Sequence, residues 1–268
     1  MQEKIIEVKN LVKKFKDFTA VNNISFSVNK GEIFAFLGPN GAGKTTTIKI
    51  LTTLLHPNSG AINVNGYSPI TDKNAVRKSF GIVFQDPSLD DELTAYENME
   101  FHAVFYGIKK KIRKERIEKL LDLVGLSERK NDLVKHFSGG MKRRLEIARG
   151  LIHHPKILFL DEPTLGLDPQ TRNFLWEYIK KMNRKEGMTV FLTTHYMDEA
   201  DRIADRIAII DYGEIIGIGT SKELKKKTNT QTLEDAFLKL TGKTIREEES
   251  SSKEHMRLRR RLWTRGRR

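Results

Sequence analysis

Residues 32–46 read EIFAFLGPNGAGKTT, and this stretch decides the fold. Residues 32–37 are mostly apolar, as in a buried strand of a parallel sheet, and residues 45–55 are predicted to form a helix that stops before Pro57. Glycines between the two elements let backbone amides point at phosphate oxygens, and the helix adds its positive end. The sequence therefore predicts a phosphate-binding loop made of Gly38, Pro39, Asn40, Gly41, Ala42, Gly43, Lys44, Thr45 and Thr46.

Lys44 and Thr45 carry the chemistry of this loop. Lys44 is predicted to bridge the β- and γ-phosphates of a nucleotide, and the Thr45 hydroxyl is predicted to ligate Mg²⁺. A glycine-rich turn with an ordinary lysine is the alternative, but the strand before the loop and the helix after it favour the phosphate site. GTPases, kinases and motors share this loop, so the loop alone does not determine the reaction.

Two adjacent acids follow a second apolar run, ILFL at residues 157–160. A strand ending there would deliver Asp161 to the metal and place Glu162 beside it, where a carboxylate can polarise the attacking water. The alternative is a helix cap or a solvated turn, which the four preceding apolar residues disfavour. The second carboxylate thus narrows the choice of reaction.

The triplet Ser138-Gly139-Gly140 precedes a predicted helix that runs through Leu145 and Ala148. Ser138 can cap that helix, but two glycines directly after a cap lower helix stability. A purely structural role leaves the glycines unexplained, whereas exposed amides at a helix start would suit a γ-phosphate. We therefore expect the triplet to contact nucleotide.

Strands and helices alternate along much of the chain, which predicts an α/β fold whose parallel sheet is covered on both faces. Strands are expected at residues 81–84, 157–160, 189–193 and 207–210, and helices at residues 169–182 and 197–204. Residues 5–8, 24–28 and 61–64, the last beside the turn signal Asn65-Gly66, predict additional antiparallel strands. In such folds ligands bind at the carboxyl ends of the parallel strands, where the motifs fall.

The length of 268 residues suits one domain with subdomains. We expect this domain at residues 1–242, with a core at about 1–92 and 152–225, a helical subdomain at about 93–151 and a final helix at about 231–242. Residues 243–268 are predicted to be a disordered charged linker and basic tail, because residues 253–268 alone carry eight Lys or Arg and one Glu. Lysines elsewhere lie beside glutamates, so the net charge of +13 does not favour a nucleic-acid partner.

Three further observations concern location. The sequence has no run near the 18 apolar residues of a membrane-spanning helix, no apolar stretch of a secretory signal at its start, and no cysteine. These observations favour the cytoplasm, and any membrane role must then depend on a partner.

The motifs together resemble those of ABC-transporter nucleotide-binding subunits, and the resemblance covers about residues 3–242. It implies a P-loop NTPase of the ABC type, with a RecA-like parallel-sheet core, an antiparallel β subdomain and a helical subdomain. By this resemblance residues 38–46 are Walker A, residues 138–141 the signature, and Asp161 and Glu162 Walker B with its catalytic glutamate. The other matches are Gln85 in the Q-loop, Leu167-Asp168 in the D-loop, His195 as the switch histidine, and Phe15 stacking on adenine, with Phe18 as the second candidate for that role.

The resemblance also implies the cofactors and the role of each residue. It implies ATP and Mg²⁺, catalytic roles for Glu162, His195, Gln85 and Lys44, and a metal site of Thr45, Gln85 and Asp161. Structural alternatives remain: His195 as a core or cap histidine, Gln85 as a surface residue at a strand end, and Phe15 as plain core. Asp168 before Pro169 is suited to cap a helix in either case.

The resemblance implies an ATP-hydrolysing subunit that drives a transporter by dimerising around two ATP molecules. Each ATP would lie between Walker A of one subunit and the signature of the other, in a homodimer or with a paralogue. A separate membrane-spanning permease subunit would hold the protein on the cytoplasmic face of the cell membrane. Residues 86–98, which include Leu89, Leu93 and Tyr96, are predicted to receive that subunit.

A finer resemblance links residues 192–201, 213–220 and 233–238 to the drug- and polysaccharide-export branch that includes daunorubicin-resistance-like ATPases, which suggests export. The basic ending departs from the pattern of that branch. A soluble ABC ATPase acting on nucleic acid or ribosomes is the alternative, but the chain holds one cassette and no long coiled-coil insertion. A nucleotide-gated binding module is a third possibility, which the intact Glu162 argues against.

Overall fold

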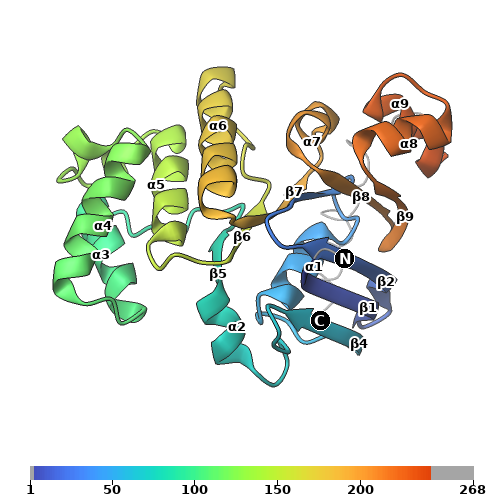
Figure 1. The fold of residues 1–268 in the computed structure, drawn as a ribbon, viewed down its shortest axis with the longest axis horizontal. Coiled ribbons are helices and arrows are strands. Elements are labelled where there is room, and N and C mark those ends of the chain that lie inside the picture. The colour runs from blue at the N-terminus through green and yellow to red at the C-terminus, as the bar shows by residue number, and fades with distance from the viewer. Residues whose placement is uncertain (1–2, 243–268) are drawn as a thin grey trace, which may run out of the picture.

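The computed structural model describes residues 3–242, in which two sheets form the framework (Figure 1). The six-stranded sheet has the order β5 (Phe80–Val83), β6 (Ile157–Asp161), β7 (Thr189–Thr194), β3 (Ile33–Leu37), β8 (Arg206–Asp211) and β9 (Glu214–Gly219). Its first five strands are parallel and β9 is antiparallel to β8. The predicted α/β fold with a parallel sheet is confirmed, and β3 lies inside that sheet with a parallel neighbour on each side.

Helices surround this sheet, and some differ from the prediction in length. They are α1 (Lys44–Leu51), α2 (Lys73–Ser79), α3 (Ala95–Phe105), α4 (Lys110–Leu123), α5 (Gly139–Leu151), α6 (Pro169–Glu186), α7 (Met197–Ile203), α8 (Ser221–Thr228) and α9 (Leu233–Thr241). Helix α1 ends before residue 55 because Thr53 adopts φ +67°. Helix α6 passes the last predicted residue and ends where Gly187 turns left-handed at φ +64°. Its last turn is polar, so hydrophobic periodicity did not predict it.

The two faces of the parallel sheet belong to separate hydrophobic clusters. On one face Ala35, Leu158 and Leu192 pack with α5 and α6. On the other face Phe36 and Phe191, whose ring centroids are 5.7 Å apart, pack with α1 and the smaller sheet. Because burying each phenylalanine contributes about 1.5–3 kcal/mol, this aromatic layer fixes the start of α1 against the end of β3.

The smaller sheet has the order β2 (Phe18–Asn29), β1 (Lys4–Phe15) and β4 (Ser59–Val64), and all neighbours are antiparallel. The expected antiparallel strands are present, but β1 and β2 are longer than predicted. Register shifts interrupt the pairing of β1 with β2, and Asn10 and Asn23 take positive φ values. Such bulges break the period-two alternation, so the sequence revealed only the regular parts of the strands.

Helices α3, α4 and α5, which we call the helical region, lie beside the β5 edge of the sheet (Figure 1). Two short 3₁₀ turns, Ser127–Arg129 and Val134–His136, connect α4 to α5. Within residues 3–242 no helix is long and apolar enough to cross a membrane. The predicted disordered linker and basic tail, residues 243–268, lie outside the described residues.

Candidate ATP site

The predicted site residues other than Ser138, Gly139 and Gly140 lie in or beside a cavity of ≈ 450 Å³ at the carboxyl end of the parallel sheet. Strand β3 leads into the glycine loop there, β6 ends at Asp161, and β7 ends at Thr194. Parallel strands end at the same edge, which is why segments far apart in sequence meet. The cavity is lined by Phe15, Phe18, Ala20, Asn40, Gly41, Gly43, Lys44, Thr45, Thr46, Gln85 and Glu162.

Two positions of the loop must be glycine, because the backbone of a neighbouring strand lies too close for a side chain. A Cβ on Gly38 would lie 2.3 Å from the carbonyl oxygen of Ile210, and one on Gly43 would lie 2.4 Å from that of Ala20. Gly43 also adopts φ +103°, which L side chains rarely take. The loop therefore lies against β8 at Gly38 and against β2 at Gly43, where no larger residue fits.

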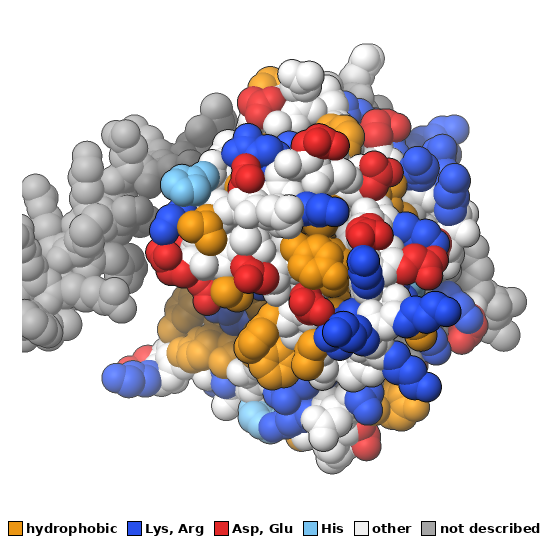
Figure 2. All heavy atoms as spheres, turned by 90° about the vertical axis from the view of Figure 1, so that its left-hand side faces the viewer, with side chains coloured by type: hydrophobic (Ala, Val, Ile, Leu, Met, Phe, Trp, Pro, Cys, Tyr) orange, Lys and Arg blue, Asp and Glu red, His pale blue; other side chains and the backbone are white. Residues whose placement is uncertain are grey.

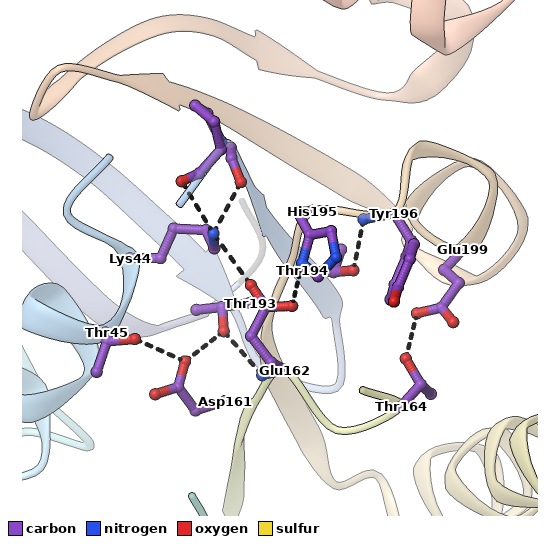
Figure 3. Close-up of polar contacts among 12 residues, drawn as sticks. Lys44, Thr45, Asp161, Glu162, Thr164, Thr193, Thr194, His195, Tyr196 and Glu199 are labelled. Carbon is purple, nitrogen blue, oxygen red and sulfur yellow. Dashed lines mark hydrogen bonds and ion pairs between the residues drawn. The ribbon is translucent and has the colours of Figure 1, made fainter. Parts of the chain in front are cut away.

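Lys44 is buried at the first position of α1, and its ammonium group contacts three oxygens. Its Nζ donates to the carbonyl of Gly38 at 2.7 Å and to that of Pro39 at 3.1 Å, and forms an ion pair with Glu162 Oε1 at 3.0 Å (Figure 3). Both Lys44 and Glu162 are 5% exposed. Burial strengthens this attraction, since the pair is shielded from water.

Asp161 is buried at the end of β6 and accepts hydrogen bonds from two threonines (Figure 3). The Thr45 hydroxyl lies 3.2 Å from Oδ1 of Asp161, and the Thr193 hydroxyl lies 2.6 Å from the same oxygen. A carboxylate and a hydroxyl are hard oxygen ligands of the kind that Mg²⁺ prefers, so this pair suits the predicted metal. Sequence reasoning missed Thr193, because a threonine inside an apolar strand carries no signal of its own.

Glu162 adopts φ +48°, an uncommon conformation for a residue with a side chain that costs roughly 1–3 kcal/mol. Its amide donates to the Thr193 carbonyl at 3.2 Å, and Nδ1 of His195 lies 2.6 Å from Oε2. Burial raises the pKa of Glu162, but the hydrogen bond from His195 and the charge of Lys44 outweigh it and hold the pKa below its usual value. An ionised carboxylate only accepts hydrogen bonds, so the proton in this contact belongs to Nδ1 of His195.

Gln85 and the two aromatic candidates form the rim of the cavity. Gln85 follows β5 and is exposed on the cavity wall. Phe15 and Phe18 pair across the turn between β1 and β2, with exposed fractions of 44% and 61%. The exposure of Phe15 excludes the plain-core alternative for this residue.

The triplet at residues 138–140 lies elsewhere. Ser138 caps α5 by accepting a hydrogen bond from the Met141 amide at 3.2 Å. Among the described residues that line the cavity, none belongs to the triplet. A Cβ on Gly139 would have no described atom within 4 Å, so the fold of this chain does not require a glycine there.

Two further buried side chains, Glu199 and Arg143, connect the elements around the site. Glu199 on α7 accepts a hydrogen bond from Thr164 at 2.8 Å (Figure 3). It also pairs with Arg172 at 3.2 Å, and burial raises its pKa. Arg143 on α5 donates to backbone carbonyls around Glu162. Both were missed, because Arg143 stands in a run of basic residues and Glu199 in an acidic segment, which read as solvated surface. Asp168 does cap α6, accepting from the Thr171 amide at 2.9 Å.

A buried lysine at the start of the helix that follows a glycine loop, opposite two adjacent acids at the end of β6, is the arrangement of a P-loop nucleoside triphosphatase. Residues 21–165 match the sequence profile described as ABC transporter. The chain belongs to the ABC transporter family, as predicted, and is an ATP-binding, ATP-hydrolysing subunit of a transporter of that family.

Individual relatives agree with this assignment. The chain is 44% identical to the linearmycin resistance ATP-binding protein LnrL of Bacillus subtilis over 85% of this chain and 73% of that protein. It is 42% identical to the daunorubicin/doxorubicin resistance ATP-binding protein DrrA of Streptomyces peucetius over 85% of this chain and 69% of that protein. The predicted likeness to the daunorubicin-resistance branch is confirmed, and the nucleic-acid alternative is not favoured.

A solved structure shows the same architecture. It is a dimeric ATP-binding cassette in a post-hydrolysis state, bound to ADP and phosphate, and it aligns with a TM-score of 0.73 and 29% identity. The alignment covers 80% of this chain and 98% of that one. The predicted ABC-type fold is thereby confirmed.

Proposed function

We propose that the cavity binds MgATP and that Glu162 is the general base of hydrolysis. The observation that carries this proposal is the fixed position of the Glu162 carboxylate, which lies beside the glycine loop between Lys44 and His195. These two partners keep the carboxylate ionised, and only the ionised form can accept a proton from water.

Lys44 changes partners in this mechanism. Its ammonium group contacts two loop carbonyls and Glu162. We propose that it exchanges these partners for the β- and γ-phosphates when nucleotide binds. When Lys44 turns to phosphate, Oε1 of Glu162 becomes free to take the proton of the attacking water, and His195 continues to hold Oε2. Thr45, Asp161 and Gln85 would hold Mg²⁺, which neutralises phosphate charge when it is bound.

We propose that the site is completed by a second subunit. Residues 138–140 sit at the exposed start of α5, outside the cavity, and nothing described in this chain needs Gly139 to lack a side chain. Free amides at a helix start bind anions, so the γ-phosphate held by a second copy, or by a paralogue, fits this position. The dimeric relative supports the arrangement.

We propose that a membrane-spanning permease subunit docks on the helical region. Leu89 and Tyr96, the predicted anchors, are half-buried against the core. On the next turns of α3, Phe101, Val104 and Phe105 are more than half exposed, and apolar side chains gather on this face (Figure 2). Exposed aromatics of this kind are the usual anchors of an interface. The docking surface predicted at residues 86–98 therefore extends along α3.

The resistance proteins LnrL and DrrA suggest what the whole transporter does. We propose that it exports drug-like compounds, with specificity determined by the permease, and that this subunit works on the cytoplasmic face of the cell membrane.

The shared site is tested with Glu162→Gln, which keeps the size of the side chain and the nucleotide contacts but removes the base. In the proposed mechanism this variant accumulates as an ATP-dependent dimer, measured by light scattering at saturating MgATP. Adding Gly139→Asp should abolish the dimer, because the new carboxylate opposes the γ-phosphate while its Cβ meets no described atom of its own chain.

Asn229→Asp, which adds the same charge at an exposed residue after α8, is the matched control and should leave the dimer intact. If the chain pairs only with a paralogue, that partner is included. A Glu162→Gln protein that binds ATP but forms no dimer, even with its proper partner present, would contradict the shared-site proposal.

A further inference from the structure

Arg143 has an interior position that is unusual for a residue in the run Lys142-Arg143-Arg144. Its side chain is 8% exposed and lies between α5 and the ends of β5 and β6. A guanidinium group has five N–H donors, and each matches one contact here. Nε donates to Pro163 O at 2.8 Å, Nη1 to Phe84 O and to Glu146 Oε2 at 3.2 Å, and Nη2 to Asp161 O at 3.1 Å and Glu162 O at 3.0 Å.

Three of these acceptors are the consecutive carbonyls of the turn that carries Glu162. Glu162 is held there at φ +48°, and its amide is held from the other side by Thr193. Arg143 therefore completes the hydrogen bonding of an unfavourable backbone turn on which the direction of the Glu162 carboxylate depends. Burying a guanidinium is costly unless its donors are all satisfied, so its presence here needs a reason beyond filling space.

The carboxylate partner of Arg143 connects the same helix to a second segment. Oε1 of Glu146 accepts from the Ser88 amide at 2.7 Å, and Arg149 donates to the Ser88 carbonyl at 2.7 Å and to its hydroxyl. With the Phe84 contact, α5 thus holds the backbone on both sides of Gln85. The helix that begins at Gly139 is bonded both to the Glu162 turn and to the Gln85 segment.

We infer that Arg143 is a positioning residue: it fixes the Glu162 turn to α5, so that the aim of the Glu162 carboxylate depends on where α5 lies. The inference rests on the role proposed for Glu162. Any shift of α5 along the sheet either breaks these bonds or moves the turn with it. Misplacing a catalytic group by about 1 Å can cost on the order of 10²-fold in rate, so a small shift is enough to switch hydrolysis.

The test compares Arg143→Lys with Arg144→Lys. Lysine keeps the charge at position 143 but offers three donors without the planar fork, so it cannot hold all the carbonyls. Arg144 is the matched control, because it lies on the same helix and also donates to a backbone carbonyl. Its acceptor is the Val124 carbonyl at 2.6 Å, and Val124 is far from the Glu162 turn in sequence. We expect Arg143→Lys to lower kcat at least about tenfold and to change KM for ATP less than about threefold, and Arg143→Met to lower kcat further. Arg144→Lys should change kcat less than about twofold.

A double-mutant cycle separates positioning from general loss of stability. The cycle is measured by single-turnover hydrolysis of labelled ATP. In a Glu162→Gln background, Arg143→Lys should lower the hydrolysis rate by less than about another twofold, because the carboxylate that Arg143 positions is gone. An equal loss in both backgrounds, or a kcat for Arg143→Lys within twofold of the parent, overturns the inference.

Glu146→Gln decides the matter if Arg143 variants do not fold. It removes the charge of the carboxylate that, among residues 3–242, forms an ion pair with Arg143. We expect a kcat loss of about three- to tenfold at unchanged KM, and an unchanged kcat overturns the inference. The two proposals fail in different ways. If Glu162→Gln itself retains near-parental turnover, the role of Glu162 is wrong; if it is inactive while Arg143→Lys is fully active, only the positioning inference is wrong.

Discussion

The cavity at the end of the parallel sheet and the exposed start of α5 contrast in how completely this chain satisfies their polar groups. In the cavity Lys44, Asp161 and Glu162 are buried, and each is paired with groups of the same chain. At the start of α5 only Ser138 has a capping contact, and Gly139 has open space in the described structure. The buried polar groups of the first region are thus satisfied within one chain, whereas the second region is open to a partner.

The difference shows which properties the fold determines and which need a second subunit. Close contacts with Ala20 and Ile210 make Gly43 and Gly38 obligatory for folding, so their substitution tests the fold as much as the chemistry. Gly139 has no such contact, so a substitution there reports on what approaches from outside. Function at the start of α5 can therefore be tested without disturbing the fold.

The largest expected effect is at Glu162 in the cavity. Glu162→Gln should lower kcat by about 10²–10⁴-fold, because a general base typically contributes that much, while the dissociation constant for MgATP changes little. Steady-state hydrolysis and equilibrium nucleotide binding measure the two quantities. Glu186→Gln, at the exposed end of α6, is the control for an equivalent loss of charge and should leave both unchanged. Weak ATP binding by Glu162→Gln would mean that Glu162 acts mainly in holding nucleotide.

The next effect concerns how the helical region is attached to the sheet. Where α3 meets the end of α5, Tyr106 stacks on His153 and contacts His102 at a tilted angle. Nε2 of His153 also contacts the Phe80 carbonyl at 2.9 Å. Burial lowers the pKa of both His102 and His153 to about 4, from an ordinary value of 6.5. The unfolded chain therefore binds more protons below pH 6.5, and stability that is complete above that pH is lost as the pH falls toward 4.

We expect a loss of roughly 2 kcal/mol per histidine across this window, reduced from the full linkage value because the rings are partly exposed. Urea unfolding at several pH values measures it. His153→Gln should remove about half of the pH dependence of the free energy of unfolding. Equal acid sensitivity of wild type and His153→Gln would show that other groups cause the loss.

The third effect is at the exposed face of α3. Burial of a phenylalanine at an interface contributes about 1.5–3 kcal/mol, so Phe105→Ser should weaken permease binding about 10- to 100-fold. Phe105 is 75% exposed, so its loss should leave the melting temperature and the ATP turnover of the isolated subunit unchanged. Tyr212→Ser, an exposed aromatic beyond β8, is the control and should leave permease binding unchanged. Undiminished coupled transport by the Phe105→Ser protein would contradict docking on this face.

The sequence predicted the residues of the cavity better than the buried residues that hold them in place, for a physical reason. Residues 38–46 and Asp161 belong to local patterns whose chemistry depends on spacing along the chain, and His195 was assigned through the family resemblance; the parallel fold then brings these segments together. Arg143 and Glu199 act through contacts between distant segments, and their burial is decided by tertiary packing, which a charged stretch of sequence does not reveal. The long bulged strands β1 and β2 were recognised only in part because their alternation is interrupted.

The smallest expected effect concerns the rim of the cavity, where two aromatics compete for one role. Phe15 is the less exposed of the pair, and the ammonium group of Lys13 lies 4.9 Å from its ring centroid, which restricts the ring. A ring that is already ordered loses less entropy on stacking, so Phe15 should be the residue that covers adenine. Stacking contributes about 0.5–1.5 kcal/mol, so Phe15→Leu should raise the dissociation constants of ATP and ADP alike by about 3- to 10-fold.

The control is Phe18→Leu, for which we expect less than a twofold change, since this ring is 61% exposed on the same turn. Fluorescent-nucleotide titration measures the affinity of both variants. The kcat at saturating ATP should be unchanged in each, because the Glu162 carboxylate is held by Lys44 and His195. Inorganic triphosphate, which has no base, provides the decisive comparison: its affinity should not respond to Phe15→Leu. A loss of triphosphate affinity equal to that of ATP would show that Phe15 shapes the glycine loop, and the adenine contact would then have to be sought at Phe18.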